Sequence, residues 1–108
     1  MITLLILQEN DVYGYQLSQL IKERSEGKLS IQEGAMYPML YRMLDAGYIS
    51  AEDIVVETKR GRRRNRVMYH IEPAGRDRLV VLKGEYEEVQ QGIRNVFKNC
   101  KEISPDES

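Results

Sequence analysis

Hydrophobic residues recur at steps of three and four in separate segments of the chain, which is the pattern of amphipathic helices. The first two such segments cover residues 13–24 and 33–46, and Gly27 and Gly47 just beyond them are typical of helix ends. A shorter apolar run over residues 2–8 predicts one more helix before them. The apolar stripe of segment 33–46 is formed by Met36, Leu40, Met43 and Leu44.

An alternating pattern follows, over residues 48–57 and 67–72. In the second stretch the β-favouring residues Val67, Tyr69 and Ile71 occupy every other position. A helix followed by a two-stranded ribbon is the arrangement of a winged helix-turn-helix. We therefore predict a mainly α fold with a two-stranded β wing.

The last segment has the most regular pattern, a 3.5-residue repeat sustained over more than three heptads. Pro73 suits the first turn of a helix, which is predicted to run to about Asn99. A helix of roughly 25 residues is about 37 Å long, more than the other helices of a small domain cover. The repeat is formed by Leu79, Leu82, Tyr86, Val89, Ile93, Val96, Cys100 and Ile103.

Such a seam predicts a second helix beside it. A helix that faced only its own core would explain Leu79 and Leu82, but it would leave Ile93, Val96 and Phe97 unaccounted for. We therefore predict a homodimer in which the long helices pair through this seam.

The length of 108 residues, with 42% hydrophobic and 31% charged residues, fits a small soluble fold. The patterns divide it into a winged helix-turn-helix DNA-binding domain over 1–72, a dimerisation helix over 73–103 and a polar tail over 104–108. Domains of this size often depend on a disulfide, a metal or a partner chain. Cys100 alone excludes an intramolecular disulfide, and one Cys with one His cannot supply four zinc ligands. No cofactor or metal is predicted, and a second chain remains as the source of stability.

Positive charge is concentrated in the predicted wing. The chain has a net charge of −1, so a polyanion would have to be bound locally. A charge run alone can equally be a solvated loop. The place of this charge run beside a helix favours the binding of double-stranded DNA, with the cations holding the phosphate backbone or the minor groove. Six of the 16 Lys and Arg residues lie here: Lys59, Arg60, Arg62, Arg63, Arg64 and Arg66.

The helix over residues 33–46 is the predicted recognition helix, placed in the major groove. Small residues at its start would let the helix end approach a phosphate. Arg42 could reach a guanine edge or a phosphate, and Tyr41 a phosphate oxygen. Tyr37 is assigned to the core, with its polar end near the DNA. The face left outside by the apolar stripe is formed by Gly34, Ala35, Pro38, Tyr41 and Arg42.

A protein-interaction or ligand-sensing module with the winged fold and no DNA operator is the alternative. The wing separates the two hypotheses, because a docking module has no use for six cations.

Other classes are less compatible with the sequence. His70 lies in a predicted strand as a surface polar residue, with no Ser, Asp or Cys near it in sequence, so no enzyme is predicted. Cys100 falls on the seam as a small hydrophobic residue. The start of the chain has no leader signal, and no stretch approaches about 18 apolar residues, so we expect a cytoplasmic protein and no membrane partner.

Four motifs occur in a distinctive order along the chain. They are Tyr13-Gly14-Tyr15, Met36-Tyr37-Pro38, Gly47-Tyr48-Ile49, and Arg62-Arg63-Arg64 leading into Met68-Tyr69-His70-Ile71. From Leu4 to about Val89 the sequence resembles the PadR family of transcriptional regulators. The resemblance implies a winged helix-turn-helix dimer that represses promoters and that is released, in several members, by phenolic acids or hydrophobic drugs. Two copies related by a dyad would bind a palindrome with half-sites about 34 Å apart.

The chain also departs from the family pattern. Glu72 stands where the family usually has a Thr capping the long helix, and Val67 and Met68 replace more polar or aromatic wing residues. The chain has no Trp, whereas a Trp on the long helix stacks flat ligands in the drug-binding subgroup. Tyr86 stands at the matching position. It is therefore the candidate contact for a small hydrophobic effector.

Overall fold

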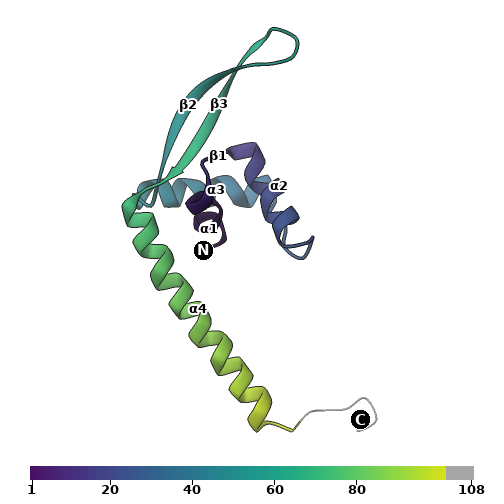
Figure 1. The fold of residues 1–108 in the computed structure, drawn as a ribbon, viewed down its shortest axis with the longest axis vertical. Coiled ribbons are helices and arrows are strands. Elements are labelled where there is room, and N and C mark those ends of the chain that lie inside the picture. The colour runs from purple at the N-terminus through teal and green to yellow at the C-terminus, as the bar shows by residue number, and fades with distance from the viewer. Residues whose placement is uncertain (102–108) are drawn as a thin grey trace.

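The computed structural model describes residues 1–101, which form a helical body from which a β wing and a long helix project in opposite directions (Figure 1). This part of the chain is 65 Å long but only 22 Å across its thinnest axis. The mainly α fold with a β wing predicted from the sequence is confirmed. The elements are α1 (Ile2–Glu9), β1 (Val12–Tyr13), α2 (Gly14–Arg24), α3 (Glu33–Asp45), β2 (Ile49–Glu57), β3 (Arg63–Ile71) and α4 (Pro73–Asn99).

The sheet has a strand that the sequence did not predict. Its order is β1-β3-β2, and both neighbouring pairs are antiparallel. The register of β1 pairs Val12 with Tyr69 and Tyr13 with Met68. A strand of two residues is too short to show alternation, which is why it was missed. β3 also begins at Arg63 rather than Val67, because a run of arginines hides the apolar–polar alternation.

A tight turn joins the two long strands at the wing tip. The Thr58 N–H donates to the carbonyl of Arg62 at 2.8 Å, and the Gly61 N–H donates to the carbonyl of Thr58 at 2.9 Å. Gly61 has a φ of +72°, a conformation that favours glycine. The turn therefore brings the wing cations together at the end of the nine-residue strands.

All four helices and the sheet contribute to one core, and the apolar stripe of α3 points into it as predicted. Met36 and Leu40 are each 1% exposed, while Met43 and Leu44 pack partly buried against the same cluster. Burial of each such side chain stabilises the fold by about 1.5–3 kcal/mol. The buried hydrophobic residues are Leu4, Ile6, Leu7, Val12, Leu17, Ile21, Met36, Leu40, Ile49, Tyr69 and Leu79.

Gly75 sets how the long helix leaves this body. A Cβ at this position would lie 2.1 Å from the carbonyl oxygen of Tyr48, in the turn before β2. The same carbonyl accepts the N–H of Glu72 at 2.9 Å. The first turn of α4 is thus held against the connection between α3 and β2 by a contact that only glycine permits.

The long helix has a buried part and an exposed part. Leu79 is 3% exposed, so it belongs to the core of its own chain, which corrects its assignment to the dimer seam. The core therefore extends past the predicted domain boundary at residue 72. Leu82 packs partly buried against the core, and the predicted seam position Ile103, like the tail 104–108, lies outside the described residues. Beyond Leu82 the exposed seam residues include Tyr86, Val89, Ile93, Val96, Phe97 and Cys100.

Candidate nucleic-acid interface

The outer face of α3 is free of packing within the described chain. Gly34, Ala35, Pro38 and Arg42 are exposed, and Tyr41 is 62% exposed. A Cβ added at Gly34 would meet no atom within 4 Å outside its immediate surroundings in the helix. Packing inside the chain therefore does not require glycine there, although a glycine inside a helix costs about 1 kcal/mol relative to Ala. The small residues at the start of α3 favour close approach by another molecule.

Tyr37 lies at the border of this face rather than in the core. The sequence pattern predicts a core residue with its polar end near the DNA, but the side chain is 36% exposed. Successive residues of a helix are rotated by about 100°, which places Tyr37 between buried Leu40 and exposed Tyr41. Its ring lies beside Gly14 and near Tyr69.

The wing carries cations that no acidic group of the described chain neutralises. None of the ion pairs found within residues 1–101 includes a wing cation. The register of β2 and β3 places Arg64 and Arg66 on one face of the ribbon and Arg63 on the other. Five of the six are exposed: Lys59, Arg60, Arg62, Arg63 and Arg64.

Arg66, at the base of the wing, is partly buried and differs from the other five. Its guanidinium carbon lies 4.8 Å from the centroid of the Tyr15 ring, a cation–π contact. The Tyr15 ring in turn stacks on Tyr13, with centroids 5.8 Å apart and an interplanar angle of 9°. The Tyr13 N–H donates to the side-chain oxygen of Gln16 at 3.0 Å, which fixes the start of α2. The stack therefore ties the wing to the first turn of α2.

Sequence reasoning missed the role of these tyrosines. The only sequence signal at this place is the Tyr-Gly-Tyr motif, which indicates a family resemblance but not a contact between Tyr15 and Arg66. The contact between Tyr15 and Arg66 depends on the pairing of β1 with β3, and the spacing of residues in the sequence does not show this pairing.

The family profile described as "Transcriptional regulator PadR-like family" matches residues 3–81. The chain belongs to this family. It is a family of transcriptional regulators and not of enzymes. No curated protein sequence matched the chain.

Solved structures agree with this membership. The smu.1704 protein of Streptococcus mutans UA159 is 31% identical, with a TM-score of 0.73, and the match covers 95% of this chain and 89% of that chain. A PadR family transcription regulator of Clostridium difficile R20291 is 25% identical, with a TM-score of 0.74 and coverages of 89% and 94%. Bacillus subtilis PadR, solved in complex with operator DNA, is 19% identical and shares the fold, with a TM-score of 0.59 over 96% of this chain and 49% of its own.

His70 connects three segments of this PadR-like chain. Its Nδ1 lies 2.8 Å from an oxygen of Asp11, and its Nε2 lies 3.1 Å from an oxygen of Glu52. The pKa of His70 is raised, mainly by the hydrogen bond to Asp11 and further by the charges of both carboxylates, while partial burial opposes the rise. His70 lies in β3 near the surface, as predicted, and chain folding brings Asp11 and Glu52, which are far from it in sequence, to its ring. Both ring nitrogens are engaged, and no cluster suited to a metal occurs within residues 1–101.

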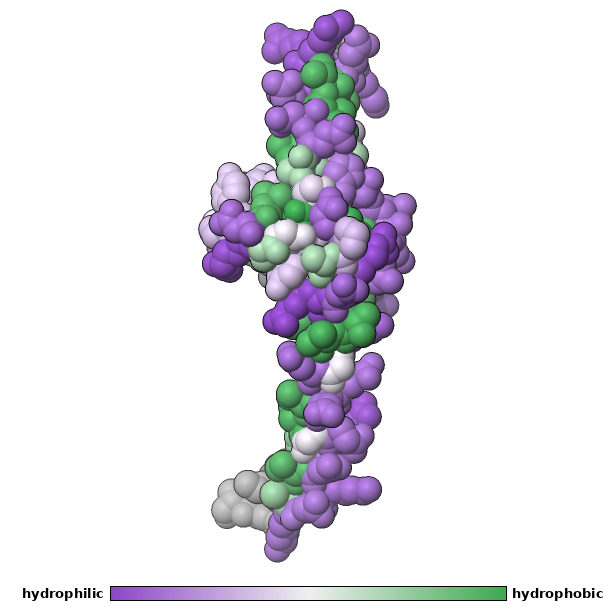
Figure 2. Space-filling view, turned by 90° about the vertical axis from the view of Figure 1, so that its left-hand side faces the viewer, coloured by the Kyte–Doolittle hydropathy of each residue, from purple (hydrophilic) through white to green (hydrophobic). Residues whose placement is uncertain are grey.

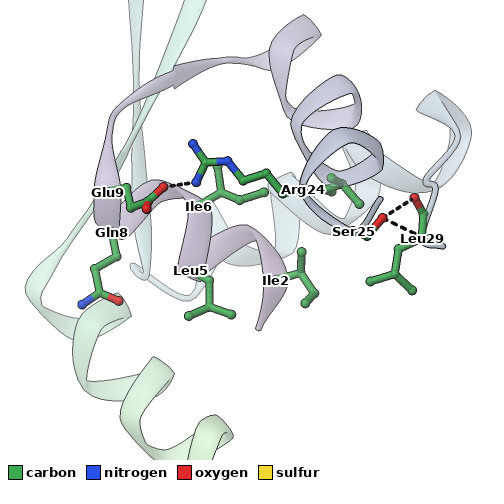
Figure 3. Close-up of a pocket in the computed structure, with 9 residues that line it drawn as sticks. Ile2, Leu5, Ile6, Gln8, Glu9, Arg24, Ser25 and Leu29 are labelled. Carbon is green, nitrogen blue, oxygen red and sulfur yellow. Dashed lines mark hydrogen bonds and ion pairs between the residues drawn. The ribbon is translucent and has the colours of Figure 1, made fainter. Parts of the chain in front are cut away.

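Two apolar hollows lie away from the wing. One, of about 610 Å³, is formed by α1, α2 and the start of the α2–α3 loop, with an ion pair between Glu9 and Arg24 at its rim (Figure 3). Its apolar lining comes from Ile2, Leu5, Ile6, Ile21 and Leu29. The other, of about 830 Å³, lies along the far end of α4, where Figure 2 shows hydrophobic side chains at the surface. Its lining residues are Val89, Gly92, Ile93, Val96, Phe97, Cys100 and Lys101.

Tyr86, the predicted effector contact, lines neither hollow. Its side chain is 48% exposed, and its hydroxyl accepts a hydrogen bond of 2.7 Å from the side chain of Gln90.

Among the helices of residues 1–101, none combines the length and the apolar character that a membrane span requires.

Proposed function

We propose that the chain is a sequence-specific regulator of transcription that binds double-stranded DNA as a homodimer and represses a promoter with a palindromic operator. The observation that carries the proposal is the combination of an unpacked outer face on α3 with unneutralised cations on the adjacent wing. The operator complex of Bacillus subtilis PadR supports it at the level of a shared fold.

The two surfaces have different tasks in this proposal. The outer face of α3 enters the major groove, with Arg42 and Tyr41 reaching bases or phosphates. The wing cations hold the phosphate backbone or the neighbouring minor groove, which contributes affinity and salt dependence rather than a base code. A chain of net charge −1 needs such a local site.

The exposed part of α4 supports the dimer. Val89 and Val96 are each 61% exposed and Ile93 is 51% exposed, all on one face of the helix. The radius of gyration is 18.9 Å, against about 13 Å for a compact domain of this length, so much of α4 has no cover of its own. Gly92 lies in the α4 hollow, and a Cβ there would meet no atom within 4 Å beyond its immediate surroundings in the helix, which leaves room for the backbone of a second helix. In such a dimer a dyad would relate the two α3 faces, as a palindromic operator requires.

A small hydrophobic effector that releases the DNA is part of the proposal. Tyr86 offers a half-exposed ring on the seam. The α1–α2 hollow has the apolar lining and volume typical of small-molecule sites. The test is to find flat aromatic compounds that raise the melting temperature of the protein. If they bind at the seam, Tyr86→Ala should abolish this rise in melting temperature. If they bind in the α1–α2 hollow, Leu5→Glu should abolish it instead.

The test is a gel-shift titration against the DNA upstream of the gene, at two salt concentrations and with non-specific competitor. The protein is expected to give a shift that resists competitor and weakens with salt. Replacing Arg62, Arg63 and Arg64 with Ala should weaken binding and flatten the slope of log affinity against log salt. The matched control removes three exposed cations of α4 instead, Arg76, Arg94 and Lys98, and should leave the slope unchanged. A protein that gives no specific shift on upstream or genomic fragments would favour the docking module.

A further inference from the structure

We propose that a small cavity between α3 and the base of the wing binds one phosphate of the DNA backbone in each half-site. This inference rests on the proposed DNA binding and names a contact that neither the outer face of α3 nor the wing tip provides. The cavity measures about 180 Å³, and the residues with polar side chains that line it are Tyr15, Tyr37, Asn65, Arg66 and Tyr69.

Three elements meet at this cavity, and glycine keeps it open. Gly14, the first residue of α2, forms part of the wall. A Cβ there would lie 3.2 Å from the ring of Tyr69 and 3.8 Å from the hydroxyl oxygen of Tyr37. The Tyr37 hydroxyl is therefore close to the cavity wall. The available volume is several times the share of one water molecule, about 30 Å³, so a tetrahedral oxyanion can enter.

The lining matches an anion. It includes an arginine, an asparagine and three tyrosines, whose side chains can all donate hydrogen bonds, and no acidic residue. Arg66 makes no ion pair within residues 1–101. Its contact with the Tyr15 ring is a cation–π contact and not a hydrogen bond, so the N–H groups of the guanidinium are left for a ligand. Because the Tyr13–Tyr15 stack already holds this side chain, binding requires less ordering of a long, flexible group.

The position of the cavity identifies the anion as a DNA phosphate. Tyr37 lies at the border of the outer face of α3, and Asn65 and Arg66 belong to the wing strand β3. A duplex docked on α3 and held by the wing passes over this junction. A phosphate bound from both sides fixes the angle between recognition helix and wing, so this contact positions the protein without reading sequence.

The experiment combines charge variants with neutralised DNA. Arg66→Gln removes the cation, Asn65→Asp introduces a carboxylate with nearly the same shape, and Tyr37→Phe removes only a hydroxyl. Operator affinity is measured by fluorescence anisotropy across a salt series. Arg66→Gln should lower the slope of log affinity against log salt by about 1.8, which is about 0.9 for each of two half-sites. Asn65→Asp should weaken operator binding at least about tenfold. Asn10→Asp makes the same charge change on an exposed loop and should have little effect.

A methylphosphonate scan supplies the decisive comparison. Each operator phosphate is replaced in turn by this neutral group, and one position per half-site should weaken binding of the wild type but not of Arg66→Gln. If Arg66→Gln unfolds the wing, as judged by circular dichroism, Asn65→Asp takes its place in the scan, because it nearly keeps the side-chain shape and its carboxylate repels a charged phosphate but not a neutral one. A scan in which every position affects wild type and variant alike overturns the phosphate site. Loss of DNA binding by the wild type itself would instead overturn the proposed function.

Discussion

The body of the protein and the far part of α4 carry similar apolar side chains in opposite environments. In the body, Leu4, Leu17 and Leu40 are each 1% exposed, so that region folds around its own core. On the same continuous helix that supplies Leu79 to this core, Phe97 is 70% exposed. One uninterrupted heptad pattern covers both parts of α4. Periodicity therefore shows which face of a helix is apolar, but not whether its own chain or a partner covers that face.

The largest effect is expected where the exposed part is given a charge. Ile93→Lys puts an ammonium group on the proposed seam, and burying it twice per dimer should weaken self-association by roughly 4 kcal/mol or more, about a thousandfold. Sedimentation velocity should then show monomers. Val80→Lys is the control, because Val80 is 71% exposed on the same helix but lies off the seam. A dimer that survives Ile93→Lys and dissociates with Val80→Lys would place the seam on the other face.

A truncation in the buried part of the same helix should act on folding instead. Leu79→Ala leaves a cavity in the core of one chain and should lower the free energy of unfolding by about 3 kcal/mol. Val80→Ala, at its exposed neighbour, should change it by less than about 0.5 kcal/mol. Urea denaturation at several protein concentrations measures both. Should the cost of Leu79→Ala vary with concentration, Leu79 would belong to the dimer interface after all.

The junction between the two regions is tested at Gly75. Gly75→Ala forces a methyl group onto the carbonyl of Tyr48, and overpacking of this kind costs about 1–3 kcal/mol. The matched variant Gly84→Ala, where the added Cβ meets no such neighbour, should stabilise the helix by about 1 kcal/mol. Thermal denaturation should show a lower melting temperature for Gly75→Ala and a higher one for Gly84→Ala. Equal shifts of the two melting temperatures would mean that α4 is not held at Gly75.

Gly34 separates stability from binding within the body. Gly34→Ala should stabilise α3 by about 0.5–1 kcal/mol, since nothing in the chain obstructs the methyl group. The same group would stand between the helix and a duplex, so operator affinity should fall by about 1 kcal/mol, or roughly fivefold. Denaturation and anisotropy titrations are run on the same preparation. A variant that gains stability and keeps full affinity would move the DNA contact away from the start of α3.

Much of this fold could be predicted from local sequence pattern. The features that could not be predicted depend on contacts between segments far apart in the sequence. The stripes of α2 and α3 and the extent of α4 follow from helical periodicity alone. The stacking of Tyr15 with Arg66 joins residues far apart in sequence, and it requires β1, whose two residues give no pattern. Tyr37 was misplaced because its position borders both the buried and the exposed face of α3. Contacts set by strand register, such as that between His70 and Glu52, have no sequence signal at all.

The smallest effect concerns His70, which stabilises the body and not the far part of α4. Its pKa is raised in the folded state, chiefly by the hydrogen bond to Asp11. A raised histidine pKa gives stability that is fully present below the unfolded value of about 6.5 and is lost as the pH rises through the folded value. The free energy of unfolding should therefore fall between pH 6 and pH 8.5 by less than about 1 kcal/mol, because both carboxylates are largely in water. His70→Gln and Asp11→Asn should each remove this part of the pH dependence, and Asp53→Asn, which changes an exposed carboxylate on the other face of β2, should keep it. If His70→Gln and the wild type lose stability equally between these two pH values, the bridge contributes nothing to folding and the pH dependence arises elsewhere.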